Sequence, residues 1–247
     1  MSAAAAFPLT VIVPAYNEEA LLDGTVRSLR NTLATLGLDA EIVIVNDGSR
    51  DRTGLIADAL ARTDSSLVVC HQQNQGLGGA IRRGAAQARG EYLLPWPADM
   101  PVNREDLRPF IDHLGQADVL VGCRRRRAGY NVLMRFNSWL YPRLVVALFG
   151  LRLRDVNWIH LYRRDHFQAI PLTQRGIPML VEILVRLRDR GATFLEIEVE
   201  MKPRAGGVAS AARLRIMWRT LVGLLAFHRT WTRERAAGGR AAVSPLA

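Results

Sequence analysis

The chain of 247 residues is 49% hydrophobic, a composition that supports a buried core and fits one large α/β domain. Its formal charge is +10, and arginine supplies every basic side chain except Lys202, so nucleic acid, anionic lipid and a diphosphate all stay open as partners. Cys70 and Cys123 lie in apolar segments without metal-ligand spacing, which argues against a disulfide or a zinc site.

Short apolar runs alternate with helical patterns along the first half of the chain. The runs predict strands at residues 9–14, 41–45, 67–70, 91–96 and 118–121. Helical spacing of apolar residues predicts helices at 18–36 and 53–62, one that ends at 88, and one at 104–115. This alternation, with its short connections, predicts a mostly parallel, twisted sheet with helices on both faces.

The C-terminal half is rich in arginine and contains two apolar stretches, at residues 139–153 and 216–227. Neither is long enough to span a bilayer, so each is expected either to lie in a membrane interface or to pack on the domain's own sheet. We expect a single domain over 8–231 that ends in an amphipathic helix, and a disordered basic tail over 232–247. The first residues lack a signal-peptide pattern, which predicts a cytoplasmic protein, free or peripheral on the cytosolic membrane face.

Polar residues follow three of the predicted strands. Tyr16 and Glu18 come after the first strand, Asn46 and Asp47 end the second, and Asp99 follows the fourth. Because the carboxyl ends of parallel strands meet at one edge of a sheet, these side chains predict a ligand site there. Taken alone, Asp99 is equally compatible with a helix cap or an Asx turn.

A glycine-rich turn, GLGGAI at residues 76–81, superficially matches a dinucleotide-binding fingerprint. Ile81 stands where that fingerprint has glycine or alanine, and the turn follows the third strand instead of the first. A dinucleotide-binding dehydrogenase is therefore disfavoured. Gly76 and Gly78 instead allow a tight turn at a helix N-terminus that can face an anion.

Six segments together resemble a known family of enzymes. They are VIVPAYNEE (11–19), IVIVNDGSRDRT (42–53), NQGLGGAIRRG (74–84), ADVLVGCRR (117–125), RDVNWIHLYRR (154–164) and KPRAGGVAS (202–210). Their order and spacing resemble the family-two nucleotide-sugar glycosyltransferases with the GT-A (Rossmann-like) fold, and within them the dolichol-phosphate-mannose synthase branch. The resemblance covers about residues 8 to 215, and it implies seven nucleotide-sugar-binding residues: Pro14, Tyr16, Glu18, Asn46, Asp47, Gly76 and Gly78.

The metal motif departs from the family pattern. Where relatives have Asp-x-Asp, this chain has Pro97, Ala98 and Asp99, and Pro101 replaces a frequent glutamine. Asp99 is then the one protein ligand expected for Mg²⁺ or Mn²⁺, assisted by substrate phosphates. Arginines that stabilise the departing diphosphate are the metal-free alternative. The resemblance also implies that Arg204, in a glycine-flanked basic loop, closes over the diphosphate, so Asp99 and Arg204 are the predicted catalytic residues.

The resemblance places the acceptor phosphate near Arg124 and Arg135. Within the run that Arg124 begins, at least two of the arginines fit a solvated charged loop instead. Trp158 stands where the family has a small residue, which weakens the transfer of an acceptor site. Glu182 matches a helical glutamate of the family, and an ordinary ion pair with Arg186 at i,i+4 explains it equally well.

Together these features predict an inverting glycosyltransferase that moves a sugar from a nucleoside-diphosphate sugar to a polyprenyl phosphate at an anionic cytosolic membrane surface. A phosphate acceptor is already anionic near neutral pH, and the sequence suggests no Asp–His pair that could activate a hydroxyl. A hydroxyl acceptor, or a catalytically silent nucleotide-sugar-binding homologue, is the alternative. A nucleic-acid partner is not expected, since it would leave the strand-end residues unexplained.

Overall fold

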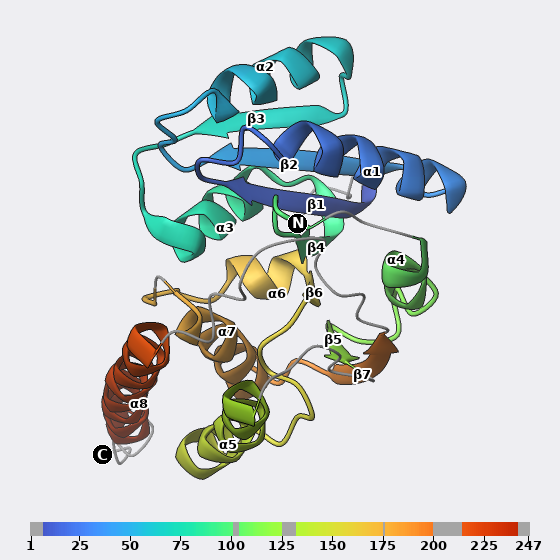
Figure 1. The fold of residues 1–247 in the computed structure, drawn as a ribbon. Helices are drawn as coiled ribbons and strands as arrows, with labels where there is room; N and C mark the ends of the chain where they lie inside the picture. The colour runs from blue at the N-terminus through green and yellow to red at the C-terminus, as the bar shows by residue number, and fades with distance from the viewer. Residues whose placement is uncertain (1–6, 101–103, 125–131, 175, 200–213, 242–247) are drawn as a thin grey trace.

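The computed structural model describes residues 7–100, 104–124, 132–174, 176–199 and 214–241. Within them a seven-stranded sheet has the order β3-β2-β1-β4-β6-β5-β7. The strands are β1 (Phe7–Ala15), β2 (Ala40–Asn46), β3 (Leu67–His71), β4 (Gly90–Pro95), β5 (Val119–Arg124), β6 (His160–Arg163) and β7 (Phe194–Val199). The sheet forms the centre of the molecule in Figure 1.

Most neighbouring strands of this sheet run parallel. β1 pairs in parallel with β2 and β4, β2 with β3, and β5 with β7. β6 is antiparallel to both of its neighbours, β4 and β5. The expected mostly parallel sheet is thus confirmed, with two strands, β6 and β7, that the sequence analysis did not predict.

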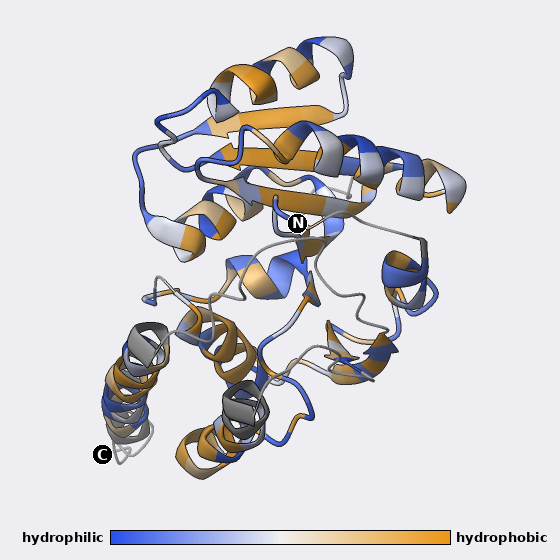
Figure 2. Ribbon diagram, in the orientation of Figure 1, coloured by the Kyte–Doolittle hydropathy of each residue, from blue (hydrophilic) through white to orange (hydrophobic). Residues whose placement is uncertain are grey.

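Helices cover both faces of the sheet. They are α1 (Leu22–Thr35), α2 (Thr53–Thr63), α3 (Gly76–Gln87), α4 (Arg104–Ile111), α5 (Val132–Phe149), α6 (Arg164–Gln168), α7 (Pro178–Asp189) and α8 (Leu214–Ala241). One buried cluster joins the sheet to α1, α2 and α4, and the other joins it to α3, α5, α6, α7 and α8. Figure 2 shows the apolar strands between these layers.

The central strand β1 contributes to both cores because successive side chains of a strand point to opposite faces. Val11 and Val13 belong to the cluster under α1, whereas Ile12 belongs to the cluster under α3. Gly84 lets α3 approach closely, since a Cβ at this position would lie 2.4 Å from a methyl carbon of Ile12. This close contact packs the C-terminal part of α3 against β1.

The C-terminal helix α8 packs on α5 and α7. The Phe227 ring stacks on Phe149 of α5, with ring centroids 5.1 Å apart, and Glu234 accepts hydrogen bonds from Arg186 of α7. The helix continues to Ala241, so the expectation of a disordered tail from residue 232 is wrong for residues 232–241. Residues 242–247 lie outside the described part. Among the described residues, none of the helices is both long and apolar enough to cross a bilayer.

Candidate functional site

The carboxyl ends of four neighbouring strands lie along one edge of the sheet. Ala15 at the end of β1 is in register with Asn46 of β2, and Asn46 is in register with His71 of β3. On the other side, Ile12 is in register with Pro95, which ends β4. The segments that carry the predicted nucleotide-sugar residues therefore leave the sheet side by side, as the parallel topology predicted.

The loops after β1 and β2 are tied to each other by hydrogen bonds. The backbone N–H of Asn17 donates to Ser49 Oγ (3.1 Å), and the N–H of Arg50 donates to Asn17 Oδ1 (2.9 Å). Next along the chain, the N–H of Glu18 donates to Thr53 Oγ1 at 2.8 Å. Asn17 has a φ of 56°, a left-handed conformation that asparagine tolerates better than most residues. The two loops thus form one structural unit.

Asn46 and Asp47 use their side chains to shape this unit. Asn46 Oδ1 accepts from the N–H of Ser49 (3.0 Å), and its Nδ2 donates to His71 Nδ1 (3.0 Å). Asp47 is buried, and its Oδ1 accepts from Gln72 Nε2 (2.7 Å) and from the N–H of Gln75 (2.8 Å). Asp47 therefore holds the start of α3 in place, a role that the sequence analysis did not assign to it.

The glycine-rich turn forms the N-terminal end of α3, as predicted. Gly76 is the first helical residue and has a φ of 74°, while Gly78 is buried one position before Gly79. Gly48, two residues after the end of β2, has a φ of 72°, and a Cβ there would lie 2.8 Å from the backbone N of Asn74. Glycine at position 48 is needed both for this backbone conformation and for the close approach of the two loops.

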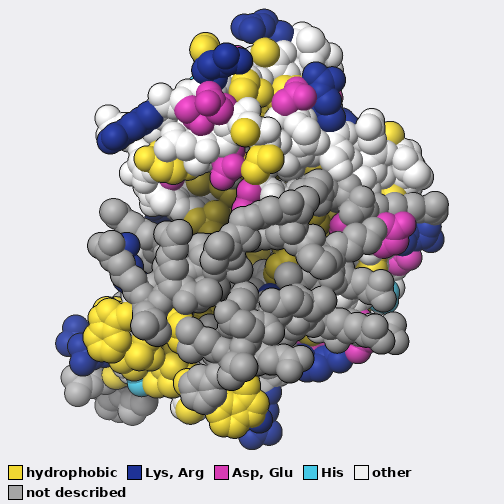
Figure 3. All heavy atoms as spheres, viewed as in Figure 1, with side chains coloured by type: hydrophobic (Ala, Val, Ile, Leu, Met, Phe, Trp, Pro, Cys, Tyr) yellow, Lys and Arg dark blue, Asp and Glu magenta, His cyan; other side chains and the backbone are white. Residues whose placement is uncertain are grey.

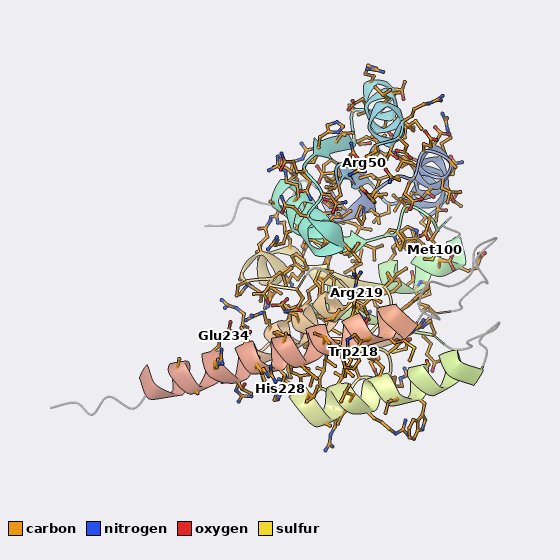
Figure 4. The ribbon with its side chains drawn as sticks, turned by 60° about the vertical axis from the view of Figure 1, so that its left-hand side comes forward. Arg50, Met100, Trp218, Arg219, His228 and Glu234 are labelled. Carbon is orange, nitrogen blue, oxygen red and sulfur yellow. The ribbon has the colours of Figure 1, made fainter. Side chains whose placement is uncertain are left out.

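Asp99 lies in a turn just beyond β4 that several hydrogen bonds hold. The N–H of Met100 donates to the carbonyl of Pro97 (3.3 Å), and Trp96 Nε1 donates to the carbonyl of Met100 (2.7 Å). Thr25 of α1 donates its Oγ1–H to the carbonyl of Ala98 at 2.7 Å, in a buried position. The turn is thus anchored to α1, and the Asp99 side chain is half-buried. In Figure 4, Arg50 lies in the upper part of the molecule, and Met100 lies lower, between Arg50 and the level of α8.

The negative charges of two other carboxylates act on Glu18, just beyond the end of β1. Burial raises the pKa of Glu18, and the negative charges of Asp99 and then Asp51 raise it further. Glu18 and Asp99 were predicted to belong to one site, and the Asp99 charge acts on the Glu18 carboxyl. Asp51 was not singled out, although it stands within the 42–53 segment, four residues after Asp47. Excess negative charge of this kind favours a bound cation.

The remaining predicted nucleotide residues lie at the same edge. Pro14 is half-buried near the end of β1, and the Tyr16 ring is 43% exposed just beyond it. An aromatic ring with a polar tip at this place can face a nucleotide base. In the described part of the chain, no three histidine, cysteine or acidic side chains gather as a metal site would require. A metal at Asp99 would therefore depend on oxygens from the substrate.

Arg124, the predicted acceptor-phosphate contact at the end of β5, is held by an acid. Its Nε donates to Asp155 Oδ2 (2.6 Å) and its Nη2 to Asp155 Oδ1 (2.9 Å). The guanidinium lies 4.8 Å from the centre of the Trp158 ring. The side chains of Arg124 and Asp155 are 9% and 4% exposed, so the pair is buried. Arg135 lies on α5 with its side chain outside the described part, and Arg204 lies wholly outside the described residues.

Glu182 is fully buried on α7 and forms the i,i+4 pair with Arg186, with Arg186 Nε 3.0 Å from Glu182 Oε1. Its carboxylate also accepts from the backbone N–H groups of Thr173 and Gln174. Arg186 also forms an ion pair with Glu234 of α8. The ion-pair interpretation of Glu182 is therefore confirmed, although the pair lies in the core and not on an exposed helix face.

The structure contains Asp–His pairs that the sequence analysis did not anticipate. His71 Nε2 lies 3.0 Å from Asp58 Oδ1, and His166 Nε2 lies 3.5 Å from Asp118 Oδ1. His71 Nδ1 accepts from Asn46, so both of its ring nitrogens are engaged by protein groups. This imidazole is arranged to orient Asn46 and is not poised to accept a proton from a substrate hydroxyl.

Comparison with solved structures defines the class of fold. Glucosyl-3-phosphoglycerate synthase from Mycobacterium tuberculosis, solved with Mn²⁺, UDP-glucose and phosphoglyceric acid, superimposes with a TM-score of 0.66 at 19% identity. The match covers 90% of this chain and 80% of that one. The same enzyme with Mn²⁺ and UDP-glucose alone also gives a TM-score of 0.66. The expected GT-A type of α/β fold is thus confirmed.

Sequence comparison identifies the family. Residues 10–173 match the family described as glycosyl transferase family 2, and the chain belongs to that family. It is 31% identical over 223 residues to undecaprenyl-phosphate mannosyltransferase of Micrococcus luteus, a match that covers 81% of this chain and 89% of that one. It is also 30% identical over 212 residues to undecaprenyl-phosphate 4-deoxy-4-formamido-L-arabinose transferase of Pseudomonas aeruginosa. That match covers 85% of this chain but only 62% of the relative's length.

Proposed function

We propose that the protein is an inverting glycosyltransferase that moves a sugar from a nucleoside-diphosphate sugar to a polyprenyl phosphate at the cytosolic membrane face. The observation that carries this proposal is the edge of the sheet where the parallel strands β2, β1 and β4 end side by side and the segments with Glu18, Asn46 and Asp99 begin. Ligands of open α/β sheets bind at such an edge. The acceptor class is supported by the two relatives named for undecaprenyl-phosphate sugar transfer.

The donor nucleotide fits the rigid side of this edge. Tyr16 offers an exposed ring to the base, and Pro14 lines the same strand end. The Asn46 amide is held at the end of β2 by Ser49 and His71, so its orientation is set before a ligand arrives. Preorganised polar groups of this kind give affinity without an ordering cost on binding. Gly76 and Gly78 let the start of α3 approach the phosphates.

Mg²⁺ or Mn²⁺ fits the acidic end of the site, where Asp99 would hold the ion together with oxygens of the donor diphosphate. The negative charges that raise the pKa of Glu18 support a cation here, and a neighbour in fold was solved with Mn²⁺ and UDP-glucose. When bound, the ion neutralises charge that develops on the leaving diphosphate. Arg204 supplies further positive charge to the same group.

In the proposed reaction, an anionic oxygen of the polyprenyl phosphate attacks the anomeric carbon of the donor sugar. The new carbon–oxygen bond forms as the bond to the nucleoside diphosphate breaks, and the electron pair leaves with the diphosphate. A single displacement of this type inverts the anomeric centre. No proton has to be removed from the acceptor, which agrees with a site whose histidine at β3 is committed to Asn46 and Asp58.

The test is transfer of radiolabelled sugar from GDP-mannose and UDP-glucose, with undecaprenyl phosphate and undecaprenol as paired acceptors. We expect label in the butanol-extractable lipid with the phosphate and not with the alcohol. Label on the alcohol, or in water-soluble products, would instead identify a hydroxyl-directed transferase. Donor binding by calorimetry without turnover on any acceptor, with or without Mg²⁺ or Mn²⁺, would identify a silent homologue.

A further inference from the structure

Helix α8 has apolar side chains on two opposite faces. Leu224, Phe227 and Trp231, spaced at i, i+3 and i+7, are buried against the rest of the domain. Trp218, Val222 and Leu225, spaced at i, i+4 and i+7, form a second stripe on the other side of the helix. This second stripe is exposed, and the Trp218 side chain, 66% exposed, is its most prominent member.

Helix α5 adds a second exposed apolar group beside this stripe. Trp139 is 52% exposed, and Leu140 next to it is also exposed. The two helices are in contact through Phe149, whose ring lies 5.1 Å from Phe227 and 5.4 Å from Trp231. Figures 1 and 4 show α5 and α8 side by side, and Figure 3 shows hydrophobic side chains gathered over both helices, with arginines at the margin.

The charge around these apolar groups has one sign. Helix α5 contains two arginines and α8 contains six, whereas Glu234 is the one acidic residue in the two helices. Glu234 is paired with Arg186 of α7. Arg143 stacks over the Trp139 ring at 4.1 Å, and Arg219 and Arg229 are exposed on α8. Two copies of such a surface would repel each other, whereas an anionic bilayer complements it.

We propose that the exposed faces of α5 and α8 form a membrane-docking surface, made by Trp139, Leu140, Trp218, Val222 and Leu225, that binds an anionic lipid bilayer. The occupant is the bilayer surface itself: tryptophan and aliphatic side chains enter the interface, and the arginines meet lipid phosphates. This proposal deepens the proposed function, on which it rests for its biological meaning. The sequence left open whether residues 216–227 pack on the domain or lie in a membrane interface. In this proposal α8 does both, because one side packs on the domain and the opposite side enters the interface.

Along the chain, the two helices of the docking surface each follow a segment that carries a predicted phosphate-binding residue. Helix α8 begins at Leu214, ten residues after Arg204, and α5 begins at Val132, eight residues after Arg124. Docking at these two helices would therefore hold the membrane on parts of the chain that follow the predicted phosphate-binding residues closely in sequence.

The apolar contribution is tested with the triple substitution Trp218→Ser, Val222→Ser and Leu225→Ser. Binding is measured by flotation with vesicles of phosphatidylcholine that contain about one-third phosphatidylglycerol. We expect the partition coefficient to fall at least about tenfold, because the three side chains lose their apolar burial in the interface. Leu55→Ser on α2 is the matched control, since Leu55 is 70% exposed, and it should bind as the wild type does.

The electrostatic contribution is tested with Arg219→Gln and Arg229→Gln combined. Each arginine near an anionic surface is worth about a fivefold change in binding, so the pair should lose about 25-fold on the anionic vesicles. On vesicles of phosphatidylcholine alone the two proteins should bind equally weakly. Arg62→Gln, an exposed arginine on α2, should leave binding to both kinds of vesicle unchanged.

A readout without destabilising substitutions covers the case in which the triple variant does not fold. Brominated phosphatidylcholine in the same anionic vesicles quenches tryptophans that enter the interface. We expect quenching in the wild type, and a clear reduction of it in Trp218→Phe. Absence of quenching in the wild type, or wild-type vesicle binding by a folded triple variant, would overturn the proposal.

Two further outcomes separate this proposal from others. A concentration-dependent dimer, seen by light scattering and removed by the triple substitution without any vesicle binding, would make the surface a protein interface and overturn the proposal. If vesicles do not bind but sugar transfer to a short-chain, water-dispersed polyprenyl phosphate proceeds, docking is overturned and the proposed function stands. If vesicles bind as expected and no transfer occurs, docking stands and the proposed function fails.

Discussion

Arg124 and Asp155 form a buried, two-point ion pair between the end of β5 and the segment before β6. Both hydrogen bonds are short, 2.6 and 2.9 Å, and the Trp158 ring covers the guanidinium. An arginine fixed in this way presents a defined edge to any ligand. Asp155 therefore sets the position of Arg124, the residue that is predicted to contact the acceptor phosphate.

Removing the acid of this pair should destabilise the protein. Asp155→Asn leaves the Arg124 charge buried without its counterion, which typically costs about 3 kcal/mol. Urea denaturation of the variant beside the wild type measures the difference in free energy of unfolding. Replacing both residues, Arg124→Met with Asp155→Leu, should recover part of the loss. If Asp155→Asn unfolds at the wild-type urea concentration, the pair contributes nothing to the fold.

Asp99→Asn should remove most of the transferase activity while the fold is retained. The substitution keeps the size of the side chain but removes the charge that would hold a metal or face the diphosphate. Loss of one such electrostatic contact lowers turnover by about 10²- to 10³-fold. Steady-state kinetics with the normal acceptor measures the loss, and Asp23→Asn, in an exposed ion pair on α1, is the control. Near-normal turnover of Asp99→Asn would remove this residue from the site.

Arg204 is predicted to act on the leaving diphosphate. Arg204→Ala should lower turnover more than it weakens binding of the free nucleotide, because a contact made mainly in the transition state stabilises it over the ground state. Arg204→Lys should recover part of the loss, since an ammonium keeps the charge but lacks the planar fork. Kinetics and direct nucleotide binding are compared for both variants. A raised donor KM with unchanged turnover would make Arg204 a general binding residue instead.

His160, buried on β6, should make stability fall in mild acid. Burial lowers the pKa of His160 from 6.5 to about 4, while the nearby Asp155 charge opposes this shift. Between these two pH values the unfolded chain binds a proton that the folded protein does not, so stability is lost as pH falls through this window. The loss is about 1.4 kcal/mol per pH unit for one group.

The test of this pH dependence is a pair of unfolding curves measured from pH 7 to pH 4. His160→Phe should lose less stability over the window than the wild type, because phenylalanine binds no proton in either state. Acids whose pKa values are lowered in the fold, among them Asp64 and Asp118, also cost stability on acidification, but they do so equally in both proteins. Parallel curves for the two proteins would exclude His160 as the source.

The strands that were predicted most accurately are buried on both faces, and such strands are nearly continuous apolar runs in the sequence. β1, β2 and β4 are apolar runs in the centre of the sheet, and their boundaries agree closely with the prediction. β6 has four residues, HLYR, too few to show a period. β7, FLEIEV, lies at the edge of the sheet and alternates apolar residues with glutamates. This alternation is the pattern of a half-buried strand, so β7 was predictable from its local sequence, whereas its pairing with β5 was not.

The C-terminal helix was predicted to end by residue 231, whereas α8 ends at Ala241, and the main cause is a contact between distant residues. Residues 232–241 contain alanine, glycine and arginine, a composition that also suits a disordered tail. What holds the helix there is a long-range contact, the hydrogen bonds from Arg186 to Glu234 across 48 residues. Packing of the Arg235 guanidinium 4.9 Å above the Trp231 ring adds to it. The Arg186–Glu234 contact has no signature in the local sequence, whereas the Trp231–Arg235 pair has the i,i+4 spacing of a helix.

The candidate site was predictable where topology alone decides it. Glu18, Asn46 and Asp99 follow strands that are parallel neighbours, so their meeting at one edge follows from the strand pattern. The role of Asp51 depends on how the β2 loop folds back towards the loop after β1. The commitment of His71 to Asn46 depends on strand register. Both are results of three-dimensional packing that the residue order leaves open.

Thr25 is expected to control the position of Asp99 through the backbone. Its Oγ1–H donates to the carbonyl of Ala98 at 2.7 Å, and both groups are buried, so Thr25→Val leaves that carbonyl without this donor. The unmet hydrogen bond should cost about 1 to 3 kcal/mol in stability and loosen the turn that carries Asp99. Turnover should therefore fall more than donor binding. Thr25→Ser, which keeps the hydroxyl, should restore most of the turnover. Equal kinetics for the valine and serine variants would show that the Ala98 hydrogen bond does not position Asp99.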